Sequence, residues 1–437
     1  MAIPSQMKLI PALVLGLFAN YVSASGFQLI EQNASGLGNA YAGSAAIADN
    51  ASTIFYNPAG MTQLQDREFS GGMAAIGTSF KFTDQGSTIG ASFPGSKLPG
   101  SGNGGDGGGW GFVPNAYLSW ALNKDLYVGV GMGAPFGMKT EYDNPWIGAA
   151  QATMFDVKTY NINPSIAYRV NDKVSVGAGL SWQRLTADYT RQVGAVVGGG
   201  GALNFSASPL KLDLQDDSWG WNVGALFTVS PDTKIGVSYR STVSYDLTGN
   251  INIVGATPVP SSDRAATASL KLPDMFILSG THQLNTKWQL LGDVSWTGWS
   301  TIPKLDIIRT SDGSLAQTLD TEFRDAWRVA VGANYQYSSD VKLKMGIAYD
   351  QTPVKSAATR LVSLPDNNRL WLSGGAQWTP SKGSVFDFGV TYLYLKDSKI
   401  DNDQRAPAGS PSIGRGRVTG SYAASAWILG VQYSHAF

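Results

Sequence analysis

Apolar residues alternate with small or polar ones, at a period of two, along most of the chain. In Val174–Gln183 the even positions hold Val, Val, Ala, Leu and Trp, and the odd positions hold Ser, Gly, Gly, Ser and Gln. The segments Leu126–Gly133, Val341–Tyr349 and Trp427–Phe437 alternate in the same way. A period of two is the geometry of a β-strand with two unlike faces. Such strands fit a membrane barrel with a wet lumen, and they fit a soluble β-sandwich equally well.

The spacing of the turns separates these two folds. Six short polar turns alternate with seven long segments, which gives fourteen strands with both chain ends on the short-turn side. The short turns are Asn123–Asp125, Asn171–Lys173, Ser230–Asp232, Asn285–Lys287, Ser338–Asp340 and Ser381–Gly383. The long segments lie near 83–111, 140–154, 191–215, 250–264, 301–320, 351–368 and 400–416. This asymmetry is typical of outer-membrane proteins. We therefore predict an all-β fold, a transmembrane antiparallel β-barrel of about 14 strands over residues 67–437.

Aromatic residues support the same fold. Trp110, Trp120, Trp296 and Trp299 lie toward the ends of predicted strands, where an interfacial girdle is expected. Phe437 places an aromatic residue at the end of the last strand, which resembles the recognition signal of outer-membrane barrels.

Composition and charge argue against several functions. The 437 residues contain 32 basic and 32 acidic side chains and no cysteine, so nothing points to nucleic acid or to disulfides. Mean hydropathy is −0.08, and beyond the N-terminal segment we find no apolar run of 18 residues, so transmembrane helices are not expected. The two histidines, His282 and His435, have no recognisable nucleophile or metal-ligand cluster beside them. We expect no enzyme, no metal and no cofactor.

The N-terminal segment divides into two parts. Residues 1–24 are predicted to be a secretory signal peptide, with Lys8, the apolar run Leu9–Ala19 and an A-x-A-like site at Val22–Ala24. The stretch Gly26–Met61 lacks strand alternation and is rich in small residues with scattered apolar anchors. About 35 residues cannot bury a core alone. We therefore interpret residues 25–66 as a mostly helical plug inside the barrel.

The plug sequence also resembles a known family. GFQLIEQNASGLGNAYAG followed by AIADNASTIFYNPAG is similar to the N-terminal hatch of the FadL family of outer-membrane transporters for long-chain fatty acids and other hydrophobic compounds. Asn57, Pro58 and Ala59 stand where that family has its NPA motif. The resemblance implies a bacterial outer-membrane protein that binds a hydrophobic small molecule, lies among outer-membrane lipid and lipopolysaccharide, and acts as a monomer. The gating residues that it implies include these three.

The third predicted strand is interrupted. After Leu126–Gly133 come Ala134, Pro135, Phe136 and Gly137. Proline cannot donate to a ladder, and glycine often marks a bulge, so pairing is expected to break here. The resemblance implies an inward kink at these four residues, which touches the hatch and opens the wall sideways. The alternative is a strand that has simply left the membrane.

Strand parity and the resemblance each predict cationic side chains that could bind a ligand head group. Arg191 follows the lumenal parity of Ser175–Gln183, and it aligns with the family's carboxylate-binding arginine. Phe323, Trp327 and Val329 are expected to share one face, which leaves Arg324 and Arg328 in the lumen. Where fatty-acid binders of the family have a lysine, this chain has Thr318. Either Arg324 replaces that charge, or the ligand is an uncharged molecule such as a monoaromatic hydrocarbon.

The expected route begins outside the cell. Trp146 and Ile147 in one long segment, with Val196 and Phe205 in the next, would capture a hydrophobic ligand. The ligand would pass to a pocket beside Phe27, and a plug rearrangement would release it through the strand-3 break. Nothing in the chain resembles a nucleotide site, so transport should be diffusive. A general porin, which needs an open lumen, and an adhesin barrel, which needs no plug, are the alternatives from other classes.

Overall fold

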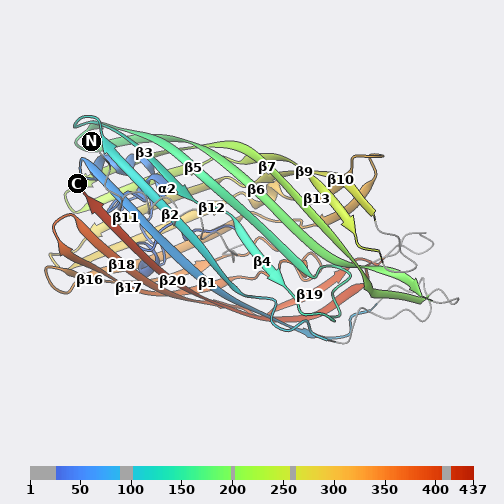
Figure 1. Ribbon diagram of the computed structural model, residues 1–437. Coiled ribbons are helices and arrows are strands. Elements are labelled where there is room, and N and C mark those ends of the chain that lie inside the picture. Colours follow the sequence, from blue (N-terminus) through green and yellow to red (C-terminus); the bar gives the residue numbers. More distant parts are fainter. Residues whose placement is uncertain (1–25, 89–101, 198–201, 256–261, 406–414) are drawn as a thin grey trace, which may run out of the picture.

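The chain forms one closed antiparallel barrel. The computed structural model describes residues 26–88, 102–197, 202–255, 262–405 and 415–437, and for 194–197 and 202–208 it describes the backbone alone. The expected signal peptide lies outside these residues. The wall is a 14-stranded barrel built from 20 strand segments in a single sheet, and it closes where β1 (Arg67–Asp84) pairs with β20 (Arg417–Ala436). The last strand ends at the left-hand end of the barrel in Figure 1, and the predicted fold class is confirmed.

Six of the fourteen wall strands consist of two segments, because bends or short breaks interrupt them. The unbroken strands other than β1 and β20 are β2 (Trp110–Ala121), β5 (Met154–Asn171), β6 (Val174–Val197), β7 (Ala202–Ser230), β16 (Val341–Asp350) and β17 (Arg369–Ser381). The paired segments are β3 (Leu126–Gly133) with β4 (Gly137–Glu141), β8 (Thr233–Arg240) with β9 (Val243–Ile253), β10 (Ser262–Leu272) with β11 (Met275–Gln283), β12 (Trp288–Thr297) with β13 (Lys304–Arg309), β14 (Leu315–Asp320) with β15 (Ala326–Gln336), and β18 (Ser384–Leu395) with β19 (Ser398–Asp403).

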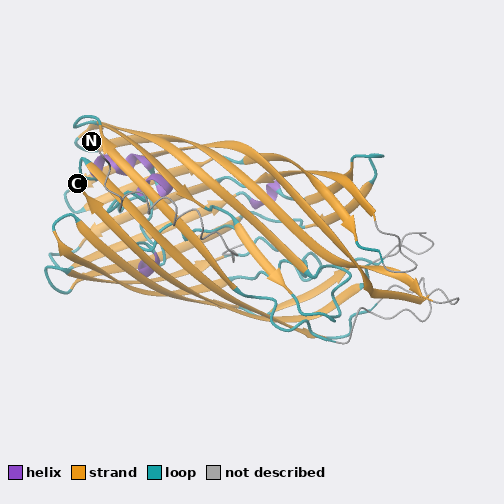
Figure 2. Cartoon of the chain, in the orientation of Figure 1, coloured by secondary structure: helices purple, strands orange, loops and turns teal. Residues whose placement is uncertain are grey.

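Two of the predicted long loops are shorter than predicted, because strands extend into them. The segment 191–215 is largely strand, because β6 and β7 stay paired up to Val197↔Ala202. The segment 301–320 contains β13 and β14, which pair with one another. Strand alternation weakens beyond the membrane, where neither face meets lipid, and the sequence pattern therefore understated these extensions. Figure 2 shows the strands continuing well toward the loop end of the molecule.

The outer face of the wall is apolar and bounded by aromatic residues. On β15 the outward residues Trp327, Val329 and Val331 are about half exposed, and the intervening Arg328 and Ala330 are buried against the interior. Among the outward Trp residues are Trp110, Trp120, Trp219, Trp221, Trp327, Trp378 and Trp427. No helix in the described residues is both long and apolar enough to cross a membrane.

The plug fills the end of the barrel at which the C-terminus lies (Figure 2). It is built mostly of turns, with three short described helices: η2 (Leu37–Asn39), α2 (Thr53–Tyr56) and η3 (Pro58–Gln63). Leu37, Tyr41, Ile54 and Met61 are fully buried and join the core that lines the inside of the wall. The expected plug is therefore less helical than predicted, since its Gly and Ala residues form tight turns against the wall.

Candidate functional site

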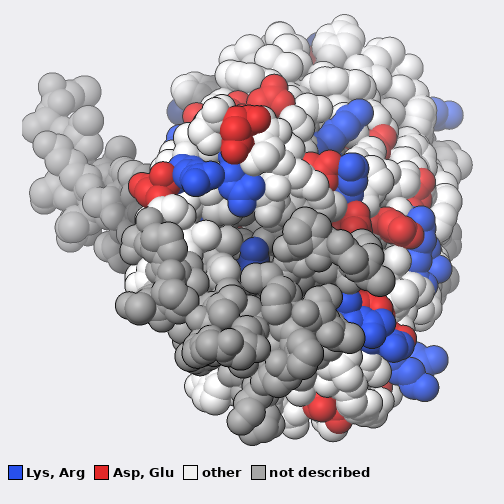
Figure 3. Space-filling view, turned by 90° about the vertical axis from the view of Figure 1, so that its right-hand side faces the viewer, with Lys and Arg blue, Asp and Glu red and all other residues white. Residues whose placement is uncertain are grey.

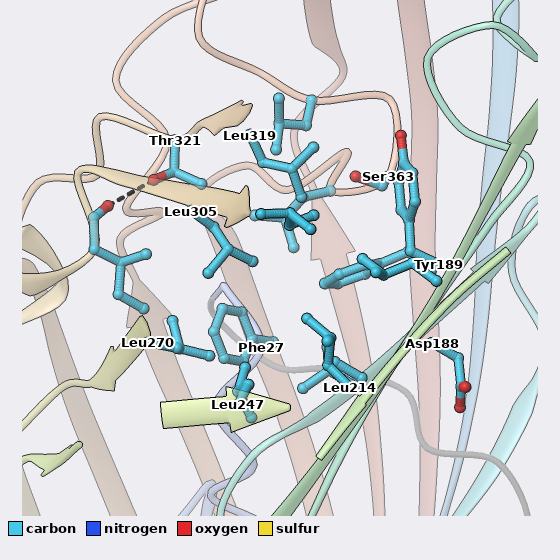
Figure 4. Close-up of a pocket in the computed structure, with 18 of the residues that line it drawn as sticks. Phe27, Asp188, Tyr189, Leu214, Leu247, Leu270, Leu305, Leu319, Thr321 and Ser363 are labelled. Carbon is cyan, nitrogen blue, oxygen red and sulfur yellow. Dashed lines mark hydrogen bonds between the residues drawn. The ribbon is translucent and has the colours of Figure 1, made fainter. Parts of the chain in front are cut away.

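An apolar cavity lies in the lumen on the extracellular side of the plug. The lining surface is wholly apolar, and the space open to the centre of a water-sized molecule is about 60 Å³. The lining side chains come from the strands between β5 and β14, from the plug and from segments outside the strands, and they include Phe27, Phe155, Tyr189, Leu214, Leu247, Leu270, Leu305, Leu319 and Phe323. Figure 4 shows the Phe27 ring at one end of this cavity, with Asp188 turned away from it.

Phe27 is the plug residue of the cavity. Its ring lies 4.9 Å from that of Trp299 and 5.9 Å from that of Phe136, measured between centroids. Trp299 is fully buried, in the short helix η4 (Trp299–Thr301), and it also contacts Phe323. The expectation that Trp299 belongs to the interfacial girdle is therefore wrong, because η4 leaves the wall and turns into the lumen. The four rings form one aromatic cluster at the base of the cavity.

The third wall strand is interrupted at the expected residues. β3 ends at Gly133 and β4 begins at Gly137, and both continue to pair with β5. On the other side, β2 pairs with β3 only from Ala116↔Met132 to Ala121↔Tyr127. The wall closes again near the loops, where the N–H of Glu141 donates to the carbonyl of Gly107. A gap in strand pairing therefore lies between β2 and the segment Ala134–Gly137.

The plug occupies the strand position that β2 leaves at this gap. Gln28 and Phe136 form an antiparallel bridge. The N–H of Leu29 donates to the Pro135 carbonyl at 2.7 Å, and the N–H of Gly137 donates to the Phe27 carbonyl at 2.8 Å. The Gln32 side chain donates to the Ala134 carbonyl and accepts from the Ala134 N–H. We name residues 27–32 the latch segment.

The Asn-Pro-Ala motif attaches the plug to the wall at β7. Asn57 caps η3 by accepting from the N–H of Ala59, and its amide donates to the carbonyls of Ala45 and of Ala225 on β7. Pro58 takes the first helical position, where its missing N–H costs nothing. Gly224 faces this contact, and a Cβ there would lie 2.1 Å from the Asn57 side-chain oxygen. The motif therefore fixes one end of the plug and does not touch the cavity.

Arg191 points into the lumen, at the extracellular end of the cavity. Its Nε donates to the side-chain oxygen of Gln317 on β14 at 3.0 Å, across the barrel from β6. Lumenal parity therefore predicted its direction correctly. Around the loop end, acidic and basic side chains alternate on the visible part of the rim, and a basic side chain is visible in the recess between the loops (Figure 3). Rim ion pairs include Lys304–Asp306, Arg405–Asp403 and Arg417–Asp401.

The side chain of Arg324 does not line the cavity. Its side-chain Nε donates to the Thr352 carbonyl, and its backbone N–H donates to the Pro353 carbonyl. The expected shared face of Phe323 and Trp327 is also wrong: Phe323 lines the cavity, whereas Trp327 is 52% exposed on the outside. The reason is the irregular segment between β14 and β15, which resets the alternation. Arg328 is buried inside, as expected, and donates to the Ala40 carbonyl.

Trp146 and Ile147, two of the residues predicted to capture a ligand, are buried and not exposed. Trp146 is fully buried, stacks on Tyr142 with centroids 4.2 Å apart, and donates its ring N–H to the Ala152 carbonyl. Ile147 is buried beside it. Val196 and Phe205 belong to the extended strands β6 and β7, and their side chains lie outside the described part. Trp146 and Ile147 therefore hold the loop together and do not present a docking surface.

Ionisable side chains are buried between the plug and the wall. Glu31, in the latch segment, is fully buried, and within the described residues neither carboxylate oxygen has a hydrogen-bond partner. Burial raises the pKa of Glu31 to about 7, against the opposing charges of Arg369 and Arg328. Lys344 is also buried and donates to Asp387 at 2.8 Å and to the Ser35 carbonyl at 2.9 Å. Across the described ranges, no group of three or more acidic or histidine side chains is placed to hold a metal ion.

Comparison with known proteins agrees with this architecture. A family model described as "Outer membrane protein transport protein (OMPP1/FadL/TodX)" matches residues 15–437. The long-chain fatty acid transport protein of Escherichia coli (strain K12) is 30% identical over 460 residues, covering 98% of this chain and 97% of that protein.

Two solved structures share the fold. The crystal structure of a Pseudomonas aeruginosa FadL homologue has a TM-score of 0.84 at 23% identity, covering 94% of this chain and 99% of that one. The Ralstonia pickettii toluene transporter TbuX has a TM-score of 0.68 at 18% identity, covering 94% of this chain and 100% of that one.

Proposed function

Because the chain belongs to the OMPP1/FadL/TodX family of outer membrane transport proteins, we propose that it takes up long-chain fatty acids by passive diffusion across the bacterial outer membrane. The observation that carries this proposal is the wholly apolar cavity, which has Phe27 of the latch segment in its lining. A ligand that fills the cavity touches the same segment that closes the wall. The fatty acid transporter of Escherichia coli, at 30% identity, supports the choice of ligand.

The apolar tunnel provides most of the binding energy. Each buried methylene contributes about 0.8 kcal/mol, so a chain of 16 carbons gives roughly 10 kcal/mol before the costs of ordering. One hydrogen bond to a charged group adds about 1.5–3 kcal/mol. Affinity therefore comes from the tail, and the cation at Arg191 orients the head group. Binding of this strength also makes unaided release slow, so a step that opens the site is needed.

Release follows from the position of the latch segment. Ligand beside Phe27 displaces its ring, and the Phe27 carbonyl is a partner of Gly137 in the bonds that seal the break. Movement of Phe27–Leu29 frees the backbone groups of Pro135 and Gly137 and opens a lateral path between β2 and β4. The Asn57 contact with β7 holds the rest of the plug in place. The lumen then stays closed to small polar solutes.

A second candidate is uptake of uncharged hydrophobic molecules such as monoaromatic hydrocarbons. Thr318 stands where fatty-acid binders of the family have a lysine, and the cavity surface carries no polar group. The fold shared with the toluene transporter TbuX is compatible with either ligand. Competition between oleate and toluene for the purified protein separates the two candidates.

A disulfide across the bridge tests the lateral route. The chain has no cysteine, so Gln28→Cys with Phe136→Cys introduces a single pair at directly opposed positions, where antiparallel strands have Cα atoms about 4.5–5.5 Å apart. We expect oxidation to block oleate uptake by cells, and reductant to restore it, while the purified protein still binds oleate. Each single cysteine variant serves as the control. Full uptake by the oxidised pair would exclude release through this break.

A further inference from the structure

The wall has a second break in strand pairing, between β10 and β13. On the side of the short turns, β11 and β12 pair without interruption up to Met275↔Thr297. On the side of the loops, the described parts of β10 and β13 pair at two positions only, of which Thr267↔Ile308 is nearer to the break. The residues in between, 268–274 and 298–307, form no ladder with one another in the described structure. We name this interval the second break.

The sequence explains why pairing fails here. Continuing the register of β10 and β13 would place Lys271 directly opposite Lys304 and would bring Pro303 into the ladder. Like charges at directly opposed positions destabilise a sheet, and proline has no N–H to donate. Lys304 forms an ion pair with Asp306 of its own strand instead, at 2.6 Å. The residues that border the second break therefore specify it.

The second break opens directly on the apolar cavity. Leu270 of β10 lines the cavity, and so do Leu305 and Ile307 of the strand across the break. Figure 4 shows Leu270 and Leu305 on the same side of the cavity. None of the described residues that line the cavity belongs to Ala134–Gly137. The second break therefore leads to the cavity itself, whereas the break after β3 lies behind the latch segment.

The second break lies at the depth of the outer membrane interface. A row of directly opposed aromatic residues crosses the wall on its short-turn side, from β8 to β15. The row consists of Tyr239, Phe276, Trp296 and Trp327. Aromatic girdles of this kind mark the depth at which lipid head groups begin. Lys271 and Lys304 lie on the loop side of the row, and both are exposed. The mouth of the break therefore has two cations at the depth of the head groups.

Side-chain packing is the main closure of the second break. The N–H of Gly298 donates to the Asp274 carbonyl at 3.0 Å, and the Thr301 hydroxyl donates to the Lys271 carbonyl at 3.2 Å. Trp299 turns its ring into the aromatic cluster at the base of the cavity. Its ring nitrogen is buried and has no hydrogen-bond partner among the described residues. Because a regular ladder would join these strands by bonds along their whole length, they separate more easily here.

We propose that the second break is a lateral entry port for an anionic amphiphile with a long apolar tail, namely a fatty acid in the outer leaflet of the membrane. This inference depends on the proposed uptake function. The carboxylate meets Lys271 and Lys304, and the tail passes between β10 and β13 into the cavity. An acyl chain favours lipid over water, because each methylene gains from burial, so the ligand approaches from the membrane. The buried state of Trp146 and Ile147 agrees with an entry other than the loops.

A covalent link across the second break tests the port. The chain has no cysteine, so Lys271→Cys with Lys304→Cys introduces one pair, which a short bis-maleimide joins without the strict geometry of a disulfide. Thr267→Cys with Ile308→Cys is the control, because it places the same link where the strands already pair. The initial rate of labelled oleate uptake by cells is measured before and after coupling. We expect coupling of the first pair to lower this rate about tenfold, and coupling of the control pair to leave it unchanged.

A second measurement tests the two lysines. The protein is reconstituted in phospholipid vesicles with diazirine analogues of oleate or of oleyl alcohol, and the rate at which the cavity is photolabelled is followed. Lys271→Gln with Lys304→Gln should slow labelling by the oleate analogue about threefold and leave labelling by the alcohol analogue unchanged. Lys382→Gln, at an exposed position of a short turn, is the matched control and should behave as wild type.

The possible outcomes separate this inference from the function on which it depends. Unchanged oleate uptake after coupling at positions 271 and 304 would overturn the entry port, while the uptake function stands. An equal loss after coupling of the control pair would indicate general stiffening of β13 and would also overturn it. If the double glutamine variant labels both analogues as wild type does, or loses both equally, the lysines do not recruit an anion. If the uncoupled protein takes up no oleate, the proposed function itself fails.

Discussion

The ring of Phe27 lies 5.9 Å from the ring of Phe136, and the backbones of the two residues meet in the same short piece of sheet. Phe27 lines the apolar cavity, whereas Phe136 belongs to the interrupted wall strand and pairs with Thr159 of β5 on its other side. One contact therefore joins the place where a ligand binds to the place where the wall is incomplete. This connection is the physical basis for coupling occupancy of the cavity to opening of the break.

The first prediction concerns Phe27 itself. Phe27→Ala removes a ring from the cavity and from the contacts with Phe136 and Trp299, which for a buried Phe costs about 3–5 kcal/mol. We expect weaker oleate binding together with faster amide hydrogen exchange at Leu29 and Gly137. Phe155→Ala, which enlarges the same cavity from β5, is the matched control. It should weaken binding and leave exchange in the latch segment unchanged; equal exchange in the two variants would contradict the coupling.

The second prediction concerns the side chain of Gln32. Gln32→Leu leaves the N–H and carbonyl of Ala134 buried without their partner, at about 1–3 kcal/mol each. We expect amide exchange of Ala134 to increase by at least tenfold, measured by hydrogen–deuterium exchange on the detergent-solubilised protein. Gln63→Leu, at an exposed position that contacts Lys234, is the control and should have no such effect. Unchanged exchange at Ala134 would show that the Gln32 side chain does not hold the break closed.

The third prediction concerns pH. The pKa of Glu31 is raised from 4.5 to about 7 by burial, so the folded plug binds this proton more tightly than the unfolded chain does. The stability from that proton is fully present below pH 4.5 and is lost as pH rises through 7, by about 3 kcal/mol at most. Amide exchange in the latch segment, corrected for intrinsic rates, should therefore accelerate between pH 5 and pH 8.

Glu31→Gln keeps the neutral shape and should remove this acceleration. Glu141→Gln, which changes an exposed carboxylate paired with Lys139, should leave the acceleration as it is in wild type. A pH response that survives in Glu31→Gln would assign it to another group. The charged neighbours of Glu31 are Arg369, Arg328 and Asp350, and Tyr41 and Tyr56 of the plug also lie within its electrostatic reach.

The fourth prediction concerns the buried pair of Lys344 and Asp387. Lys344→Met leaves Asp387 as an uncompensated buried charge and removes two hydrogen bonds to Ser35 of the plug. We expect a loss of about 3–5 kcal/mol in unfolding free energy, measured by denaturant titration. Adding Asp387→Leu should restore part of it. The exposed pair Arg184–Asp217 is the control, since its removal should cost at most about 1 kcal/mol.

The sequence by itself determined the barrel, the number of its strands and the plug. It also predicted the break at Pro135 and the inward direction of Arg191. These features depend on local physics: a pleated strand alternates every residue, proline cannot donate, and short polar turns reverse the chain wherever they occur. Parity remains reliable as long as a strand is regular, which is why Arg191 and Arg328 were placed correctly.

Only the tertiary structure decided what meets in the lumen. The irregular residues between β14 and β15 reset the alternation, so Phe323 and Arg324 do not lie on the faces that parity predicted. Trp299 and Trp146 were expected at exposed or interfacial positions, and they are buried because their segments fold inward. The pairing of Gln28 with Phe136, and the bond from Arg191 to Gln317, join residues more than a hundred positions apart in sequence. Such contacts exist only once the cylinder has closed, since closure sets which strands face one another across the interior.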